Sequence, residues 1–391
     1  MTIVFFVHPT FLDSQSMPKF ASMLSEGMAK RGHTIEVWSP QSFFFRLPLA
    51  KSFRKWLGYL DQYLVFPIGV KLRFMRGKGE KLFVFSDQAL GPWVHLVAKS
   101  PHVIHCHDFL AQRSALGEIP QNKVTWTGKR YQAYIRKGFR QGKNFISVSQ
   151  NTKNDLHRFL TTTPQISEVV YNGLNQSFNP GDSAGARILL TRQCGVELTS
   201  GYLLHVGGNQ WYKNRKGIVE IYNALRLNNS TSLPLLLIGK NPDAELSEMI
   251  ASSNFKDDIH CLSNINDDTI KQAYIGASIF LFPSLAEGFG WPIAEAMASG
   301  CLVVTTNEAP MTEVAGDAAF LIPPRPPGKE TAKAWAQEAA EVVAGAIRLS
   351  ETERMSAVNA GLENAKRFNT QQSLENIEAI YKDILQSYKI Q

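Results

Sequence analysis

The sequence predicts an α/β protein made of two domains, each built around a parallel β-sheet. Its 391 residues exceed what one hydrophobic core usually holds, so about two domains are expected. Apolar runs at 3–7 and 34–38 flank a helical pattern at 17–31, and this βαβ order implies parallel strands. The same alternation of strand and helix returns from Tyr202 onwards. We therefore expect the second domain to repeat the architecture of the first.

Further short apolar runs in the first half are expected to extend the first sheet. They lie at 82–85, 103–106 and 145–148. The sequence VVYNG at 169–173 ends this half, and its Asn-Gly pair suits a hinge between domains. The domain boundary is therefore expected near residue 173.

The second half continues the pattern with five expected strands and seven expected helices. The strands are expected at 202–206, 235–238, 259–262, 280–282 and 301–305. One helix is expected to begin near Pro292 and to end at Gly300, and the others are expected at 184–192, 218–225, 267–277, 330–349, 351–367 and 370–387.

Composition places the chain among globular proteins, with 44% apolar and 19% charged residues. The net charge of +7 fits anionic substrates or a membrane surface. The 4 cysteines show neither metal-ligand nor redox spacing, which predicts reduced thiols in the cytosol. The amino terminus has no basic start or cleavage site, and no run approaches the roughly 18 apolar residues of a membrane span. We expect a cytoplasmic protein that, if it meets membranes, lies on the inner face of the cell membrane.

The segment 43–81 combines apolar and cationic residues with only two acids, Asp61 and Glu80. Its aromatic and aliphatic residues include Phe43, Phe44, Phe45, Leu47, Leu49, Trp56, Leu57 and Tyr59. Its cations are Arg46, Lys51, Arg54, Lys55, Lys71, Arg73, Arg76, Lys78 and Lys81. This pattern is typical of an interfacial helix on anionic lipid; the alternative is a core-packed helix with a solvated basic edge. Nucleic acid is not expected as a partner, because no recognised binding module accompanies the charge.

An acidic loop containing glycine is expected before a helix that begins near Pro292, a residue that favours the first helical position. Glu287 falls in this loop and Glu295 in the first turn of the helix. Between them, Gly288 and Gly290 let the backbone approach a ligand and present amides at the positive end of the helix dipole. The loop suits a polyhydroxylated, anionic ligand, because carboxylates accept from hydroxyls and amides donate to oxyanions. The alternative is a surface loop with a helix-capping glutamate.

A cationic turn follows the strand expected at 202–206. Gly207 and Gly208 open this turn, which leads into the helix expected from about Ile218. Its cations are Lys213, Arg215 and Lys216. Backbone amides, the helix dipole and cations together form a cradle for a diphosphate, and the alternative is a basic helix cap.

Polar residues also follow two strands of the first domain. The loop at 8–18 comes after the first strand, and open parallel sheets bind ligands at that end of their strands. The sequence IHCHDF at 104–109 places His105 and His107 on the same side of a strand end. No third metal ligand is near, so we expect no metal here. His107 is either a structural histidine or one that contacts a ligand.

The string PSLAEGFGWPIAEAMASG at 283–300 resembles the E-x7-E signature of the retaining glycosyltransferases of family GT4, which have the GT-B fold. The resemblance implies two Rossmann-like domains with parallel sheets facing across a cleft, and a C-terminal helix that crosses back to the first domain. It implies an acceptor-side domain of residues 1–172 with about 371–391. The nucleotide-sugar domain would be residues 173–370.

By this resemblance Glu287 meets the donor sugar and Glu295 meets the ribose of the nucleotide. The amides implied at the sugar are those of Gly288, Phe289 and Gly290. His107 would contact the sugar or the diphosphate, and Asp108 would fix its ring or tautomer. The residues implied at the base are Asn264 and Ile265.

The resemblance leaves open which cation meets the diphosphate. Family members carry an Arg directly after the first glycine, where this chain has Gly208, and a Lys several residues later. Counting back from the helix selects Arg215 and Lys216, whereas counting forward from Gly207 selects Lys213. All three remain candidates for contact with the diphosphate, and Lys216 and Arg215 are preferred.

The chain contains no D-x-D triplet, the usual carboxylate clamp for a divalent ion in metal-dependent glycosyltransferases. We therefore expect no metal and no cofactor, with cations and helix amides meeting the charge of the departing diphosphate. The expected reaction moves a hexosyl unit of the mannose or glucose type, with retention, from a GDP- or UDP-linked sugar to a saccharide or lipid-linked saccharide. Such a reaction suits assembly of a cell-surface polysaccharide or lipopolysaccharide.

Two other functions fit the same pattern. Another GT-B enzyme, such as a sugar phosphorylase or a nucleotide-sugar epimerase, would also use these motifs. A non-enzymatic two-domain sugar-binding protein shares the architecture, although the cationic turn argues against it.

Overall fold

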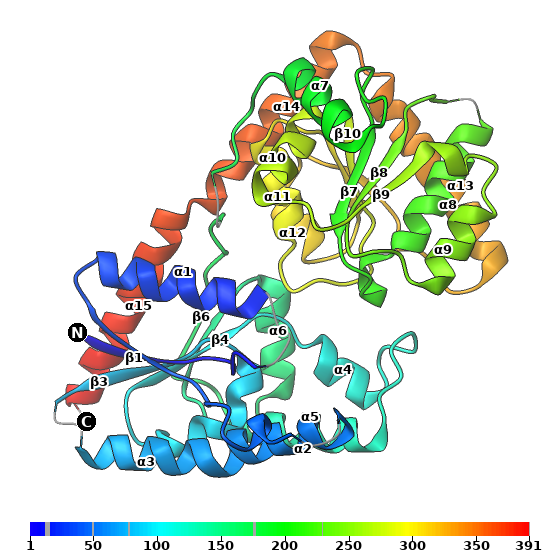
Figure 1. Ribbon diagram of the computed structural model, residues 1–391. Coiled ribbons are helices and arrows are strands. Elements are labelled where there is room, and N and C mark those ends of the chain that lie inside the picture. The colour runs from blue at the N-terminus through cyan, green and yellow to red at the C-terminus, as the bar shows by residue number, and fades with distance from the viewer. Residues whose placement is uncertain (12–15, 49–50, 77–78, 175–176, 229, 391) are drawn as a thin grey trace. The chain divides into compact units, whose positions relative to one another are not determined.

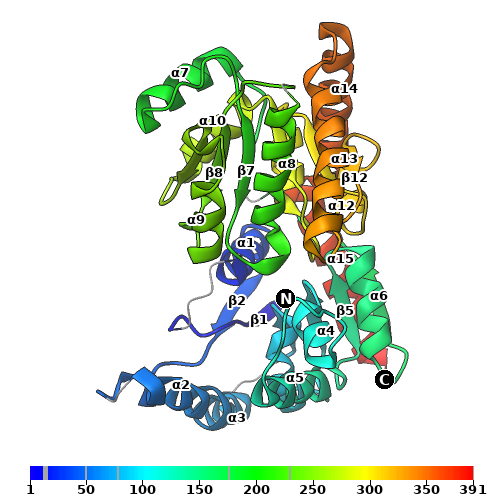
Figure 2. The ribbon, with the colours of Figure 1, turned by 90° about the vertical axis from the view of Figure 1, so that its right-hand side faces the viewer.

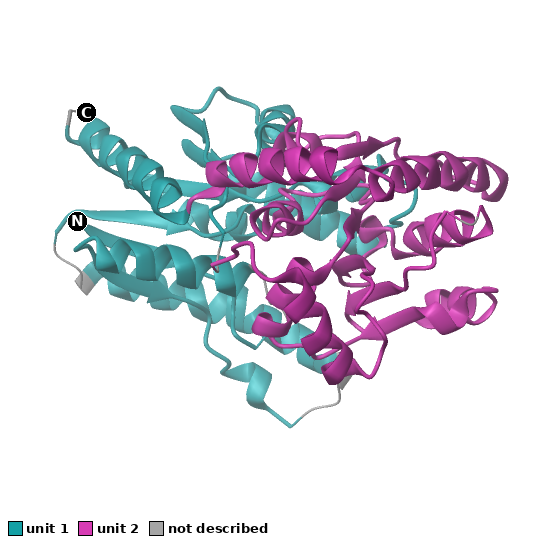
Figure 3. Ribbon diagram, turned by 90° about the horizontal axis from the view of Figure 1, so that it is seen from above, with its two compact units in different colours: residues 1–175, 370–391 teal, residues 176–369 magenta. Residues whose placement is uncertain are grey.

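Two parallel β-sheets of six strands each organise the chain. The computed structural model describes residues 1–391 except 12–15, 49–50, 77–78, 175–176, 229 and 391. One compact unit comprises Met1–Asn175 and Thr370–Gln391, and the other comprises Gln176–Asn369 (Figure 3). The expected α/β class with two Rossmann-like halves is confirmed.

The sheet of the first unit has the order β2-β1-β3-β4-β5-β6, and all of its neighbouring strands are parallel. Its strands are β1 (Thr2–Phe6), β2 (Thr34–Trp38), β3 (Lys81–Phe85), β4 (His102–Cys106), β5 (Asn144–Ser147) and β6 (Ile166–Val169). Strands β1 to β5 agree with the expected apolar runs to within one residue, whereas β6 was not expected as a strand. The order reverses between β1 and β3, because the chain builds β2 on one side of β1 and the later strands on the other.

Helices cover both faces of this sheet (Figure 1). They are α1 (Ser16–Lys30), α2 (Lys51–Leu60), α3 (Phe66–Arg76), α4 (Leu110–Leu116), α5 (Trp126–Phe139), α6 (Gln150–Phe159) and α15 (Thr370–Ile390), with a π-turn η2 (Asp61–Val65) and 3-10 turns η1 (Phe44–Arg46) and η3 (Gln88–Leu96). Figures 1 and 2 show α2, α3 and α5 together on one face, and α1 lies with α15 on the other. The C-terminal helix thus belongs to the first unit, as the GT-B resemblance implies.

A hydrogen bond between two buried groups ties α15 to this sheet. The hydroxyl of Tyr381 lies 2.7 Å from Nε2 of His105 in β4. The ring of Phe20, from α1, packs edge-on against the same imidazole. Burial lowers the pKa of His105 to about 3, so the ring that bonds Tyr381 is neutral.

Acidification from about pH 7.5 to about pH 5.5 is expected to destabilise the first unit. In the unfolded chain His105 takes up a proton near its ordinary pKa of 6.5, whereas the folded chain takes it up only near pH 3. Stability is therefore lost as the pH falls through this window, by roughly 1 kcal/mol from His105 at about pH 5.5. Urea unfolding followed by tyrosine absorbance at both pH values measures the effect. The variant His105→Gln keeps an acceptor for Tyr381 without titrating, and an undiminished pH effect in it would contradict the assignment.

The sheet of the second unit has the order β12-β11-β10-β7-β8-β9 and is also parallel throughout. Its strands are β7 (Leu203–Gly207), β8 (Leu235–Gly239), β9 (Ile259–Leu262), β10 (Ile279–Phe282), β11 (Val303–Thr306) and β12 (Phe320–Ile322). Its helices are α7 (Ser183–Cys194), α8 (Arg215–Leu227), α9 (Ala244–Ala251), α10 (Asp267–Gly276), α11 (Trp291–Ala298), α12 (Met311–Ala315), α13 (Lys329–Ile347) and α14 (Glu351–Ala365), with the 3-10 turns η4 (Trp211–Lys213), η5 (Lys256–Asp258) and η6 (Lys366–Phe368).

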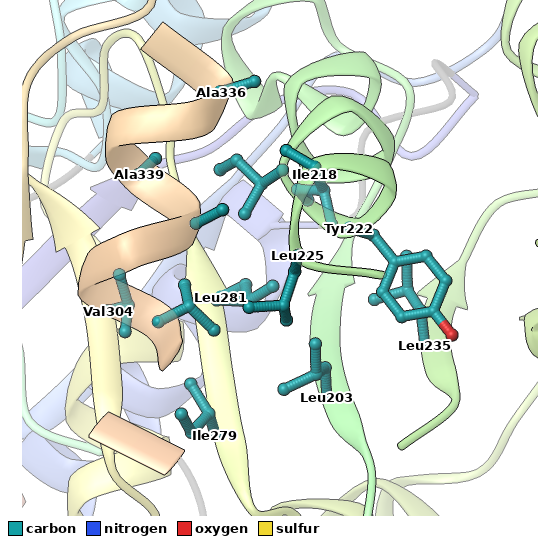
Figure 4. Close-up of a cluster of buried hydrophobic side chains, with 14 of the residues drawn as sticks. Leu203, Ile218, Tyr222, Leu225, Leu235, Ile279, Leu281, Val304, Ala336 and Ala339 are labelled. Atoms are coloured by element: carbon teal, nitrogen blue, oxygen red, sulfur yellow. The ribbon is translucent and has the colours of Figure 1, made fainter. Parts of the chain in front are cut away.

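A continuous apolar core joins helices α8 and α13 to the strands of this sheet. Ile218 and Leu225 of α8, together with Ala339 of α13, are fully buried. Figure 4 shows these side chains directed towards Leu281 and Val304 of the central strands. The small alanine faces of α13 allow it to pack closely against α8. This core holds the first turn of α8 in place over the carboxyl ends of the strands.

Candidate functional site

The candidate site lies at the carboxyl ends of β7 and β10, where the strand order of the second sheet reverses. From β7 the chain builds β8 and β9 on one side, then returns to place β10 on the other side. The loops that leave β7 and β10 therefore diverge above the sheet. In open parallel sheets, ligands bind in the crevice that such a reversal creates.

The two loops that the sequence singled out are joined directly at this point. The Nζ atom of Lys213 lies 2.7 Å from Oε1 of Glu287. Two hydrogen bonds beside this ion pair run from Asn214 Nδ2 to the carbonyl of Pro283 (2.9 Å) and from the amide of Leu285 to the carbonyl of Tyr212 (2.7 Å). The cationic turn and the acidic loop thus form one structure.

The local conformation of Asn214 places Lys213 in this position. Asn214 has a left-handed backbone, with φ of 52°, and its Oδ1 accepts a hydrogen bond from the amide of Gly217. It thereby caps α8, which begins at Arg215 and not at the expected Ile218. Lys213 consequently ends the 3-10 turn before the helix, and its side chain turns towards β10.

The Lys213–Glu287 pair is largely shielded from water, with side-chain exposures of 15% and 9%. The ammonium also lies 5.0 Å from the ring centre of Phe282, a favourable cation–π distance. Attraction between charges is stronger in such surroundings than at the surface. The pair therefore presents a positive and a negative group together to any ligand in the crevice.

Arg215 is buried beside this pair and keeps two donors without a partner. Its Nη1 donates to the carbonyl of Lys240, 2.8 Å away at the end of β8, and to Oδ1 of Asn209. Its Nε and Nη2 atoms are buried and have no hydrogen-bond partner among the residues that the structure describes. Burial lowers the pKa of Arg215, although arginine stays charged at neutral pH. Buried donors without partners are costly, which indicates room for a ligand acceptor here.

The side chain of Lys216 is directed towards α9. It forms an ion pair with Glu245 of α9, and both side chains are substantially exposed, at 39% and 73%. Because α8 begins three residues earlier than expected, Lys216 is its second residue and lies on its outer surface. The expected order of preference is therefore revised: Lys213 comes first, Arg215 stays a candidate and Lys216 comes last.

The glycines of the turn are required by close packing. Gly207 ends β7, and a Cβ atom there would lie 2.7 Å from Nε2 of His205. Gly239, at the end of β8, has φ of +149°, and a Cβ atom there would lie 1.9 Å from the carbonyl oxygen of Gly207. Gly208 follows Gly207 and is partly exposed. The strand ends thus expose bare backbone at the crevice.

Sequence reasoning missed His205, which lies directly beneath this turn. Its Nδ1 donates to the carbonyl of Leu281, 2.9 Å away, and its buried Nε2 has no partner in the described part of the chain. Burial lowers its pKa to about 3, so the ring is neutral. The hydroxyl of Ser284, after β10, is also buried without a partner. A histidine inside the apolar run LLHVG was the available signal for His205.

The acidic loop differs from the expectation in one respect. Helix α11 begins at Trp291, so Pro292 is its second residue and Glu295 lies beyond its first turn. Glu295 accepts a hydrogen bond from the hydroxyl of Tyr274 at 3.0 Å. Gly290, with φ of 109°, is the N-cap residue of the helix.

Phe289 packs into the body of the unit. Its buried ring contacts Trp291 and Phe368 edge-on. The side chain therefore anchors the loop, and only its backbone remains for a ligand.

Asn264 and Ile265 follow β9, at the same edge of the sheet. Asn264 is exposed and has φ of 56°, and Ile265 is partly buried. Strand β9 lies beside β8, two places from β7. The two residues are thus on the β9 side of the crevice.

The first unit carries its own polar cluster at the reversal between β1 and β3. His8 follows β1, and its Nε2 lies 2.8 Å from Oδ2 of Asp87, which follows β3. Although burial acts against it, the hydrogen bond from His8 lowers the pKa of Asp87. Of the loop at 8–18, residues 12–15 lie outside the described residues. Sequence reasoning singled out the loop at 8–18 as a whole but neither His8 nor Asp87 individually.

His107 is buried at the end of β4, next to this cluster. Its Nε2 lies 2.9 Å from the carbonyl of Ser86, so the proton sits on Nε2 and Nδ1 is left as an acceptor. Burial lowers the pKa of His107, which keeps the ring neutral. The group that holds the tautomer is thus the Ser86 carbonyl, and not Asp108 as expected. Asp108 instead accepts from the amide of Leu110 at the start of α4.

Two searches of the described part of the chain gave no result. It contains no cluster of three or more His, Cys, Asp or Glu residues that could hold a metal ion. None of its helices combines the length and apolar character needed to cross a membrane.

Comparison with known proteins identifies the family. The model described as Glycosyl transferases group 1 matches residues 191–337, and the one described as Glycosyltransferase Family 4 matches residues 18–178. The crystal structure of Anabaena Alr3699/HepE in complex with UDP has a TM-score of 0.68 and 17% identity, covering 97% of this chain and 99% of that one. Both halves of the chain thus match models of glycosyltransferase families, and the chain has the GT-B fold.

Two curated relatives of the chain are named as mannosyltransferases. The chain is 33% identical over 126 residues to O-antigen chain mannosyltransferase B of Escherichia coli, covering 32% of the chain and 33% of that protein. It is 23% identical over 339 residues to the MMP alpha-(1->4)-mannosyltransferase of Mycolicibacterium hassiacum, covering 75% and 78%. The chain thus spans about a third of the length of the Escherichia coli protein.

Proposed function

We propose that the chain is a retaining, metal-independent glycosyltransferase of family 4. It would move a hexosyl unit from a GDP- or UDP-linked sugar to a hydroxyl of a saccharide or lipid-linked saccharide. The observation that carries the proposal is the Lys213–Glu287 ion pair at the reversal of the second sheet. A nucleoside diphosphate sugar needs both of these groups, a cation for its diphosphate and a carboxylate for its hydroxyls.

The donor would bind by replacing contacts that these side chains now make with each other. The diphosphate takes the ammonium of Lys213 and the Nε and Nη2 donors of Arg215. The carboxylate of Glu287 then accepts from hydroxyls of the sugar. Amides of the loop at Gly288 and Gly290 add further donors at the positive end of α11. Glu295 would meet the ribose, and Asn264 and Ile265 the base.

Departure of the nucleoside diphosphate places negative charge where Lys213 and Arg215 lie. Fixed cations and amides that meet this charge stabilise the transition state without rearranging at the moment of reaction. The neutral ring of His107 would accept a hydrogen bond from a sugar hydroxyl at Nδ1, because Ser86 already takes its Nε2 proton. The departing diphosphate itself would take the proton of the acceptor hydroxyl, on the same face of the sugar.

The relatives favour a mannosyl donor and an acceptor of a surface polysaccharide. Both curated proteins described above are named as mannosyltransferases, one of them for the O-antigen chain. The proposed setting is the cytoplasmic side of the cell membrane, where such saccharides grow on lipid carriers. The His8–Asp87 pair would lie on the acceptor side, as part of the first unit.

A thermal-shift screen of nucleoside diphosphates and their sugars tests the proposal. A matching ligand at about 100 times its Kd is expected to stabilise the protein by roughly 2.7 kcal/mol. We expect GDP or UDP to act and the shift to persist in EDTA. The variant Lys213→Ala should lose most of the shift. If no nucleoside diphosphate raises the melting temperature, the donor site is not where we place it, and loss of the shift in EDTA would refute metal independence.

A further inference from the structure

The segment of the first unit that joins β2 to β3 exposes a long apolar stripe. Helix α2, the π-turn η2 and helix α3 follow one another without a break from Lys51 to Arg76. We refer to this continuous helical segment, residues 51–76, as the rod. Large apolar side chains recur along it three or four residues apart. The stripe consists of Phe53, Trp56, Leu60, Leu64, Ile68, Leu72 and Met75, each between 42% and 76% exposed. Spacing of this kind keeps the side chains on one side of a helix.

The π-turn helps to keep the stripe straight. Four residues of α-helix advance about 40° beyond one full turn, so a repeat of four would wind gradually around the rod. The stripe advances by four residues at each step from Trp56 to Leu72. Residues Asp61–Val65 form a π-turn, which takes more residues per turn and opposes this drift.

The rod cannot rotate to bury its stripe, because its other side already belongs to the core. Phe66 and Val70 are buried, and the ring of Phe66 lies 4.6 Å from that of Trp93. The hydroxyl of Tyr63 also bonds that of Tyr131 at 2.7 Å, which ties the rod to α5. The stripe therefore remains on the outside of the folded unit. Monomeric proteins rarely leave so large an apolar surface uncovered without a partner for it.

The charges around the stripe identify the partner. Residues 41–76 contain seven Lys or Arg and one acid, Asp61. Asp61 is buried, and its carboxylate accepts from the amides of residues 43–45. The cations whose side chains are described here are all exposed: Arg46, Arg54, Lys55, Lys71 and Arg73. Cations thus flank the apolar stripe, and the one acid of the segment faces inward.

The neighbouring helix α5 extends this charge. Residues 119–154 contain eight Lys or Arg and no acid. Trp126, at the start of α5, is 69% exposed, and the guanidinium of Arg130 lies 5.0 Å from its ring centre. Exposed tryptophan beside a cation is typical of side chains at a membrane–water boundary. Figures 1 and 2 show α2, α3 and α5 along the same side of the unit.

We propose that this surface docks on an anionic lipid bilayer, with the stripe inserted at the headgroup level and the cations on lipid phosphates. An amphipathic helix with a basic border binds such membranes in its own plane. A second copy of the chain fits less well, because it would bring an equally cationic border against the first. The proposal does not depend on the glycosyl-transfer reaction, since the second unit supplies the proposed donor site.

Co-sedimentation with vesicles tests this surface on the full chain. We expect binding to vesicles of equal parts phosphatidylcholine and phosphatidylglycerol, and little to phosphatidylcholine alone. The double variant Arg54→Gln/Lys55→Gln should bind about 25-fold more weakly, at about fivefold for each cation. The double variant Phe53→Ser/Trp56→Ser should bind at least about 100-fold more weakly, because two large apolar groups no longer insert.

The matched control replaces apolar side chains that are equally exposed in the second unit. Leu227 and Met355 are 65% and 58% exposed, and Leu227→Ser/Met355→Ser should bind vesicles like the parent chain. Circular dichroism and melting temperature establish that each variant is folded. Absence of binding to the anionic vesicles, or binding that the Phe53/Trp56 variant leaves unchanged, overturns the proposal. A dimer in solution that this variant dissociates would assign the stripe to a second copy and overturn it as well.

Discussion

Replacing Glu287 with glutamine is expected to lower glycosyl transfer at least about 100-fold, the scale on which removal of one preorganised polar contact reduces turnover. Gln keeps the size of the side chain but loses the negative charge that pairs with Lys213 at 2.7 Å. Its amide accepts less strongly from sugar hydroxyls and does not hold the ammonium in place. Turnover of a nucleoside diphosphate sugar, measured by release of the nucleoside diphosphate, gives the result.

A matched variant separates this effect from a general loss of charge. Glu245 also pairs with a lysine of the same segment, Lys216, but on the exposed surface. Glu245→Gln should leave turnover within about twofold, because exposed ion pairs contribute little. The side chain of Glu287 is only 9% exposed, so Glu287→Gln should also lower the melting temperature slightly. Turnover that is equal in the two variants would remove Glu287 from the donor site.

Replacing Lys213 with alanine is expected to weaken binding of the nucleoside diphosphate by about 10- to 100-fold, the worth of a charge-assisted hydrogen bond. Transfer should fall further, because the charge on the diphosphate grows as it departs. Isothermal titration with GDP and UDP measures the first effect, and initial rates measure the second. The reason is the position of the ammonium, which turns into the crevice beside Glu287.

Lys216→Ala is the matched control, since Lys216 lies three residues along the chain and bears the same charge. Its pairing with Glu245 on the outer surface predicts a change within about twofold in both measurements. A larger loss at Lys216 than at Lys213 would restore the alignment counted back from the helix. It would also mean that the donor binds on the α9 side of the crevice.

The positions of most strands follow from the sequence because their signal is local. Continuous apolar runs such as 82–85 and 235–238 suit strands buried on both faces, and the structure has β3 and β8 there. The acidic loop and the cationic turn were also recognisable, since glycines, carboxylates and cations at fixed spacing are features of the sequence itself. The parallel sheets follow from the alternation of strand and helix.

The local sequence did not decide whether the apolar side chains of the stripe are buried or exposed. The pattern at 43–81 predicted either a core-packed helix or one at a lipid surface. The structure contains an apolar face on each side of the rod, one packed on Trp93 and one exposed at Trp56. Burial depends on what lies against a helix, and a single sequence does not contain that information.

The sequence by itself determined that an acidic glycine loop and a turn with three cations follow two strands of one parallel sheet. The tertiary structure alone decided that Lys213 meets Glu287, that Lys216 faces Glu245, and that His8 meets Asp87. The physical reason is that side-chain direction within a turn depends on where the helix starts. Here the left-handed backbone of Asn214 makes α8 begin at Arg215. Lys213 therefore faces Glu287, whereas Lys216 faces Glu245.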